Sequence, residues 1–343
     1  MTNRIAQLQL SLTADALIIE HPIDLLYLTH LPMSAGKLIV LRHEAKLLVD
    51  GRYFETARSQ ALCPVFLLSS DAIKQALGQA HTIAFDSATT SVEAFDQWQK
   101  QIPGAKWVKT PFPTQTMRSI KEPSEIEHLK KAARLTWDGH KHVISLLREG
   151  ISEEELAFAF EMFCRQKGAS RLSFESIIAF GENSALPHHR SSRRTLKQGD
   201  TVLIDVGAVV DGYAGDLTRV VFFGAPNPLI ASDWELLKET QAKAVAMVKP
   251  GIRLGDIDAW VRETFRKHKV DDLFVHNLGH GIGLEVHEFP RIRYDGHNAD
   301  TIAKPGMVFT IEPGLYRPGI GGVRYEDTVL VTQHGVENFS PHA

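Results

Sequence analysis

The sequence predicts an α+β protein of two domains, and three observations lead to this prediction. The chain has 343 residues. This exceeds the roughly 250–300 residues at which a single hydrophobic core stops growing. Residues 1–115 alternate short apolar runs with helix-like runs, which is typical of a small α/β domain with a mixed sheet. Residues 120–343 combine apolar runs with well-marked helices, and the proline-rich segment KTPFPTQ at 109–115 predicts a linker before them.

In the first domain, short apolar runs bounded by polar residues predict buried strands. These strands are expected over Ala16–Glu20, Leu38–Leu41, Lys46–Val49 and Thr82–Phe85. Helices are expected between them, over Phe54–Gln60 and Asp71–Gly78.

In the second domain, helix-start signals are the clearest feature. Pro123 suits the first turn of a helix, and Glu122 and Glu125 suit its positive end. Ser152 and Glu155 form a capping box that starts a second helix. Two further helices are expected over 232–248 and 256–268, and strands over 201–206, 219–223, 308–312 and 327–331. His140 and His142 fall on the helix that starts at Pro123, where we expect a solvated face.

Composition excludes several classes of protein. The 38 Lys and Arg against 41 Asp and Glu give a formal net charge of −3, whereas nucleic-acid-binding proteins usually carry a basic excess. We find no apolar run of the ~18–20 residues that would span a bilayer, and no signal-like apolar stretch at the start. With only Cys63 and Cys164, we expect free thiols and a cytoplasmic location, although one disulfide would use both.

Two aspartates could meet across a hairpin. Asp205 ends the apolar run VLID, and Asp216 follows eleven positions later, after a turn expected at Asp211 and Gly212. Two carboxylates at neighbouring strand ends repel each other unless a cation or a shared proton compensates. A metal site and a pair of solvated turn residues are both open readings of this segment alone.

Three histidines occur in the segment HNLGHGIGLEVHE, namely His276, His280 and His287. The glycines between them permit close approach of the backbone. The segment is not the HExxH helix of zinc proteases. Its GxGxG stretch is a weak dinucleotide signal, because no ribose-binding acid follows in a clear βαβ unit.

Two glutamates and another histidine pair complete the candidates. Glu312 ends the run FTIE, Glu326 lies in VRYEDT, and LPHH supplies His188 and His189. Each acid taken alone would be an ordinary strand-end carboxylate. One imidazole and four carboxylates suit Mn²⁺, Co²⁺, Zn²⁺ or Fe²⁺, and two ions about 3.5–4 Å apart are physically reasonable. The combined set is Asp205, Asp216, His280, Glu312 and Glu326.

Five motifs occur in order: LIDVG, GYAGDLTR, GHGIGLEVHE, TIEPGLY and GGVRYED. In this order they resemble the pita-bread metallopeptidase family, which includes aminopeptidase P, prolidase and methionine aminopeptidase. The resemblance covers residues 120–343 and implies a pita-bread (creatinase/aminopeptidase-like) catalytic domain. The first 115 residues resemble the small α/β domain of aminopeptidase P and prolidase, which methionine aminopeptidases lack.

The resemblance implies a role for each candidate residue. The five donors would hold two divalent ions, with Asp216 and Glu326 bridging them. Mn²⁺ is the preferred ion, although Co²⁺ or Zn²⁺ would fit the same donors. The implied catalytic residues are His188, His287 and Glu312, and the implied substrate-binding residues are His276, Tyr316 and Arg324. His189 and the following RSSRR run depart from the family pattern, and we expect this to alter specificity rather than chemistry.

The function implied by this resemblance is a metal-dependent Xaa-Pro aminopeptidase. The alternative is a prolidase restricted to Xaa-Pro dipeptides. A metal-free creatinase-like hydrolase and a non-catalytic peptide-binding protein share the fold, but both are disfavoured because all five ligands are present. We expect proline-containing peptides or dipeptides as substrates, no nucleic-acid or membrane partner, and a homodimer.

Overall fold

The computed structural model describes residues 3–296 and 298–340. The chain divides between Thr116 and Met117 into two compact units. We refer to them as the amino-terminal and the carboxy-terminal unit. No helix in the described ranges is long and apolar enough to cross a membrane. Cys63 and Cys164 are both free thiols, as expected.

The amino-terminal unit is built on one mixed six-stranded sheet with the order β4-β3-β2-β1-β5-β6. Antiparallel pairing joins β1 to β2 and β2 to β3, whereas the remaining neighbours pair in parallel. The strands are β1 Ala16–Ile19, β2 Lys37–Leu41, β3 Ala45–Val49, β4 Val65–Leu67, β5 Thr82–Phe85 and β6 Lys106–Lys109. The helices are α1 Arg4–Leu10, α2 Pro22–Thr29, α3 Phe54–Gln60, α4 Ser70–Leu77, α5 Val92–Gln101 and α6 Gln115–Ser119, the last of which spans the boundary between the units.

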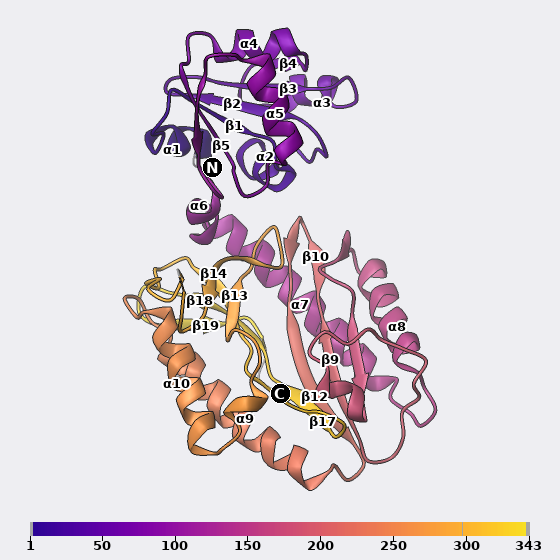
Figure 1. Ribbon diagram of the computed structural model, residues 1–343. Coiled ribbons are helices and arrows are strands. Elements are labelled where there is room, and N and C mark those ends of the chain that lie inside the picture. The colour runs from indigo at the N-terminus through magenta and orange to yellow at the C-terminus, as the bar shows by residue number, and fades with distance from the viewer. Residues whose placement is uncertain (1–2, 297, 341–343) are drawn as a thin grey trace. The chain divides into compact units, whose positions relative to one another are not determined.

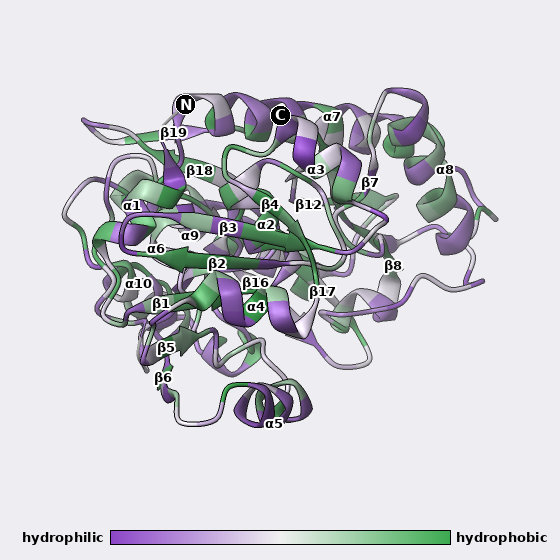
Figure 2. Cartoon of the chain, turned by 90° about the horizontal axis from the view of Figure 1, so that it is seen from above, coloured by the Kyte–Doolittle hydropathy of each residue, from purple (hydrophilic) through white to green (hydrophobic). Residues whose placement is uncertain are grey.

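Burial explains why some of these elements were recognisable in the sequence. All four residues of β1 are buried, because this strand is in the middle of the sheet. Figure 2 shows β2 and β3 as mainly hydrophobic, whereas α5 carries many hydrophilic residues. The edge strands β4 and β6 carry exposed residues. Strand β4 is apolar but only three residues long, and β6 begins and ends with lysine, so neither stands out in the sequence. The sequence analysis therefore located β1, β2, β3 and β5 and missed both edges.

The carboxy-terminal unit packs two pairs of helices against short sheets. The helices are α7 Pro123–Ser145, α8 Glu153–Gln166, α9 Pro228–Met247 and α10 Leu254–Lys267, with short 3₁₀ turns at Gly181–Ala185 and Asp271–Leu273. One three-stranded sheet has the order β12-β9-β8, formed by Leu217–Phe223, Asp200–Val206 and Ile177–Phe180. Another has the order β11-β10-β7, formed by Tyr213–Ala214, Ala208–Val210 and Arg171–Leu172.

A five-stranded sheet has the order β14-β13-β15-β18-β19. Its strands are Glu288–Ile292, Gly279–Gly281, Val308–Ile311, Asp327–Val331 and Val336–Asn338, and a separate hairpin pairs β16 Gly314–Arg317 with β17 Gly321–Arg324. Figure 1 shows α7 and α8 beside β9 and β10, and α9 and α10 beside the strands that follow them in the chain. Each helix pair covers its own apolar core, so the strand ends between the two cores are left to form a site.

Two details differ from the sequence-based expectations. Helix α9 starts at Pro228, four residues earlier than expected, because the Asn227 side chain caps it by accepting from the Leu229 amide. His140 is only 2% exposed, so the expected solvated face is wrong for this residue. Its ring stacks on Trp137, and burial, together with the nearby Arg219, lowers the pKa of His140 to about 3.

The contact between α7 and α8 gives a test of packing. Gly139 lies inside α7, where alanine would ordinarily stabilise a helix by about 1 kcal/mol. Here an added Cβ would lie 2.6 Å from Phe160 Cε2 and 2.9 Å from Cys164 Sγ, and both of these side chains are fully buried. Overpacking costs about 1–3 kcal/mol, and two contacts under 3.0 Å put this site in the upper part of that range. After the helix gain is subtracted, we predict that Gly139→Ala lowers the free energy of unfolding by about 1–2 kcal/mol.

Urea unfolding of both proteins measures this difference. Gly335→Ala in the same unit is the control, because nothing lies within 4 Å of its added Cβ and its φ is not in the left-handed region. Its free energy of unfolding should change by less than about 0.5 kcal/mol. A Gly139→Ala protein as stable as the parent would contradict the packing described here.

Candidate metal centre

A hairpin brings the two aspartates to the same place, as the sequence predicts. Strands β9 and β12 pair antiparallel, with Asp205 opposite Thr218. The chain turns between them at Asp211 and Gly212, whose φ angles of 52° and 87° are both left-handed. Such a pair of residues forms the two-residue turn that matches the twist of a hairpin. Asp216 immediately precedes β12 and therefore lies beside Asp205 at the end of these strands.

His280 enters the site from the middle of the five-stranded sheet. Its strand β13 lies between β14 and β15, and the glycines on either side permit this approach. A Cβ on Gly279 would lie 1.9 Å from the Thr310 carbonyl oxygen, and one on Gly281 would lie 2.3 Å from that of Phe289. The predicted close backbone approach is therefore confirmed.

The hydrogen bonds of His280 leave one ring nitrogen free for a cation. Its Nδ1 donates to the Gly281 carbonyl oxygen at 3.1 Å, which assigns the proton to Nδ1. Its Nε2 lies 3.4 Å from Glu312 Oε1 and 3.6 Å from Asp216 Oδ2. The Nε2 lone pair thus faces two carboxylates.

The two glutamates reach the same point from neighbouring strands. Glu312 follows β15 and Glu326 precedes β18, and these strands pair with Ile311 opposite Asp327. One ligand atom from each of Asp216, His280 and Glu326 lies within 4.8 Å of the others. A group this compact can bind a metal ion.

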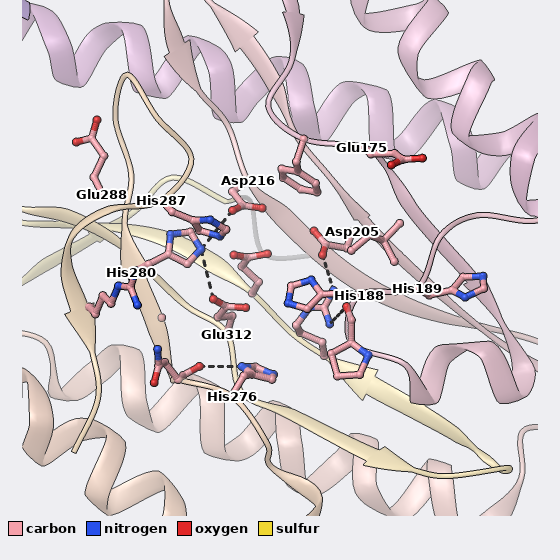
Figure 3. A pocket seen from close by; sticks show the side chains of 18 of the residues that line it. Glu175, His188, His189, Asp205, Asp216, His276, His280, His287, Glu288 and Glu312 are labelled. Atoms are coloured by element: carbon pink, nitrogen blue, oxygen red, sulfur yellow. Dashed lines mark hydrogen bonds and ion pairs between the residues drawn. The ribbon is translucent and has the colours of Figure 1, made fainter. Parts of the chain in front are cut away.

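Asp205 supplies the clearest sign that a cation fits here. Its Oδ2 accepts a hydrogen bond from Arg324 Nη2, whereas its Oδ1 is buried and has no hydrogen-bond partner among the described residues. A buried carboxylate oxygen without a partner is costly. All five predicted ligands line one pocket of about 560 Å³ (Figure 3). The residues present therefore fit a metal centre.

The titration behaviour of the cluster agrees with its use as a cation site. Burial, and next the charge of Glu326, raises the pKa values of Asp216 and Glu312 well above the usual range. Burial, together with Asp205, raises the pKa of Glu326 to about 8. Burial, and next His287, lowers the pKa of His280 to about 3, so its imidazole is neutral at pH 7. A divalent cation compensates crowded carboxylates and accepts a neutral imidazole as a ligand.

The remaining predicted histidines surround this cluster. His188, His276 and His287 all line the pocket. The His287 ring lies edge-on to that of His280, with centroids 4.4 Å apart. Burial lowers the pKa of His287, and it lowers the pKa of His276 to about 3.

Arg324 borders the pocket, whereas Tyr316 is not among its lining residues and contacts His276 through a hydrogen bond. His276 Nδ1 donates to the Asn277 carbonyl at 2.8 Å, so its Nε2 accepts from the Tyr316 hydroxyl, also at 2.8 Å. Arg324 Nη1 donates to the same hydroxyl at 2.8 Å. Arg324 is 3% exposed, and its other donors are directed at Asp205, at Thr218 Oγ1 and at the Pro187 carbonyl. Its guanidinium is therefore already engaged by the protein.

Sequence reasoning missed two threonines that support the glutamates. Thr218 Oγ1 donates to Glu326 Oε2 at 2.8 Å and accepts from Arg324 Nε at 3.1 Å. Thr310 Oγ1 accepts from the His280 amide at 3.1 Å and lies 3.5 Å from Glu312 Oε1. The available signal was spacing, because each threonine is two residues from a candidate ligand and residues i and i+2 share one face of a strand.

Comparisons with known proteins identify the family to which the chain belongs. Residues 127–333 match metallopeptidase family M24, and residues 3–120 match the creatinase/prolidase N-terminal domain. An Xaa-Pro dipeptidase from Pyrococcus furiosus is 35% identical over 329 residues, which are 95% of this chain and 93% of the relative.

Solved structures of peptidases also match nearly the whole chain. An Xaa-Pro dipeptidase from Bacillus anthracis superposes with a TM-score of 0.94 at 31% identity, over 99% of this chain and 96% of that one. An X-Pro aminopeptidase from Thermotoga maritima has a TM-score of 0.89 at 28% identity, over 98% of both chains. The predicted pita-bread fold with a smaller α/β domain is confirmed. The chain belongs to metallopeptidase family M24.

Proposed function

We propose that this protein is an Xaa-Pro dipeptidase, or prolidase. The sequence analysis placed Xaa-Pro aminopeptidase first and prolidase second. The relatives that match nearly the whole chain support the reverse order, because those from two Pyrococcus species and from Bacillus anthracis are named Xaa-Pro dipeptidase. Xaa-Pro aminopeptidase remains the second candidate function, because the structure from Thermotoga maritima that matches this chain is named X-Pro aminopeptidase.

The observation that carries the proposal is the meeting of four carboxylates and His280 in one pocket bordered by four further histidines. Asp205, Asp216, His280, Glu312 and Glu326 would hold two divalent ions. Mn²⁺ is our choice of ion, since carboxylate-rich sites suit hard cations. Bound ions of this kind supply Lewis acidity, which activates water and polarises a carbonyl.

Glu312 is the proposed general base. Its carboxylate lies at the junction of the cluster and the open pocket, 3.4 Å from His280 Nε2. In this position it can accept the proton that the attacking water loses. His188 and His287 would donate hydrogen bonds to the oxygen that becomes negative as the peptide carbonyl is attacked.

The proline side of the substrate would meet His276. Its ring is fixed by Asn277 and Tyr316, which offers a rigid wall to a pyrrolidine ring. The sequence analysis gave Arg324 a direct substrate contact. Because the guanidinium is already bound by Asp205 and Tyr316, we propose that it acts by holding these two groups. The free α-amine of the substrate would be attracted by the negative charge of the cluster.

Substrate length is the first prediction. Protein loaded with Mn²⁺ should release alanine from Ala-Pro and should leave Ala-Pro-Pro-Ala intact, with free alanine followed by mass spectrometry. EDTA should abolish the release, and Mn²⁺ should restore it. Cleavage of both peptides would establish the aminopeptidase instead, and release from neither by metal-loaded protein would overturn the proposal.

Removal of one candidate ligand is the second prediction. Asp216→Asn should lower the metal content of purified protein and reduce kcat/KM for Ala-Pro at least about 100-fold, because a neutral amide is a poor ligand for a hard cation. Metal content is measured by inductively coupled plasma mass spectrometry.

Asp211→Asn is the matched control for this variant. Asp211 lies in the same hairpin but is exposed, and it pairs with His128 and Lys131. It should keep its metal and its activity within about twofold. Full metal content in Asp216→Asn would contradict the ligand assignment.

A further inference from the structure

The second histidine of the LPHH motif has no role in the chemistry proposed above. Figure 3 shows the His189 ring directed away from the carboxylates, although the residue borders the pocket. Its Nε2 donates to Glu153 Oε2 at 2.8 Å. Glu153 belongs to the first turn of α8 and is fully buried. A buried carboxylate so far along the chain from His189 requires an explanation.

Both oxygens of Glu153 are used by one segment of the chain. Oε1 accepts from the Phe180 amide at 2.8 Å and from Asn183 Nδ2 at 2.9 Å. Oε2 accepts from the Ser192 amide at 2.9 Å, from Ser192 Oγ at 2.6 Å and from His189. Burial alone would raise the pKa of Glu153, but these bonds outweigh it and lower the pKa. The ionised carboxylate thus fastens residues 180–192 at four points.

The fastened segment carries His188. The His189 amide donates to the Leu186 carbonyl at 3.0 Å, which closes a β-turn with Pro187 and His188 as its central residues. The Pro187 carbonyl accepts from Arg324 Nη1 at 3.4 Å. His188 is therefore held from one side by the residue that binds Asp205 and from the other by the bond between His189 and Glu153.

We propose that His189 and Glu153 are positioning residues that fix the turn bearing His188. The proposal rests on the proposed function, in which the His188 imidazole acts on the substrate. Neither residue would touch the reacting atoms, because the Glu153 oxygens are occupied by the protein and His189 Nε2 points at Glu153. The departure from the family pattern at His189 would then serve orientation rather than specificity.

A double-mutant cycle tests this role. His189→Ala should lower kcat for Ala-Pro about 10-fold with KM within about twofold, since small displacements of a catalytic group are costly. In a His188→Ala background the same change should have an effect of less than about twofold, because the group it positions is gone. His189→Gln keeps an N–H donor and should recover kcat to within about threefold of the parent.

Two results would overturn the proposal. The first is an undiminished effect of His189→Ala in the His188→Ala background. The second is a His189→Gln protein as slow as His189→Ala, which would mean that the imidazole itself contacts the substrate. Metal content should equal that of the parent in every variant. The matched control is His128→Ala, which removes another histidine–carboxylate pair, with Asp211 at 3.0 Å, outside the pocket.

Hydrogen exchange separates this proposal from the proposed function. The amides of residues 186 and 188–192 should exchange about 10-fold faster in His189→Ala than in the parent. In His128→Ala they should exchange at the parental rate. Both results are expected whether or not Ala-Pro is a substrate. Unchanged exchange in His189→Ala would contradict the proposal that His189 and Glu153 hold the turn that carries His188. A parent protein inactive on Ala-Pro would overturn the proposed function, and the exchange rates would still decide whether His189 holds the turn.

Discussion

Repulsion between buried carboxylates is the constraint on which the rest of the carboxy-terminal unit depends. Asp216, Glu312 and Glu326 each have a raised pKa, because burial and their neighbours' charges disfavour the ionised forms. The neutral imidazole of His280 adds a lone pair but no compensating charge. Burial of such a cluster destabilises the folded protein unless cations occupy the site. A divalent ion bound at this site would therefore compensate the charges of these carboxylates.

Two buried arginine side chains hold the residues of the cluster in place. Arg324 binds Asp205 and Tyr316, and its Nε contacts the threonine that donates to Glu326. Arg219 donates to the Glu326 carbonyl at 2.5 Å and to Asp327 Oδ1 at 2.7 Å. Loss of either partner in a buried pair leaves an uncompensated charge. Arg324 therefore holds the Asp205 carboxylate, and Arg219 holds the backbone at Glu326.

The two proposed oxyanion histidines are supported in the same way, from opposite sides of the pocket. His188 is followed by His189, which is bound to the buried Glu153. His287 is followed by Glu288, whose carboxylate accepts from Arg118 at 2.5 Å and from Lys121 at 3.2 Å. In both cases the proposed catalytic side chain is on a turn or immediately before a strand, and the next residue anchors the backbone through a buried charge. Rigid support of this kind keeps a reacting group oriented.

The sequence by itself determined much of the local structure and the set of candidate metal ligands. Apolar runs identified the inner strands, capping residues identified α8, and Asp211–Gly212 identified the hairpin, because these signals depend on neighbouring residues. Only the tertiary structure decided which distant groups meet. It placed Glu153, the hydrogen-bond partner of His189, on α8, and it buried His140. It also directed the N–H donors of Arg324 to groups of the protein, including Asp205. A linear pattern records the periodicity of a segment but not the distance between segments, so these contacts could be read only from the folded chain.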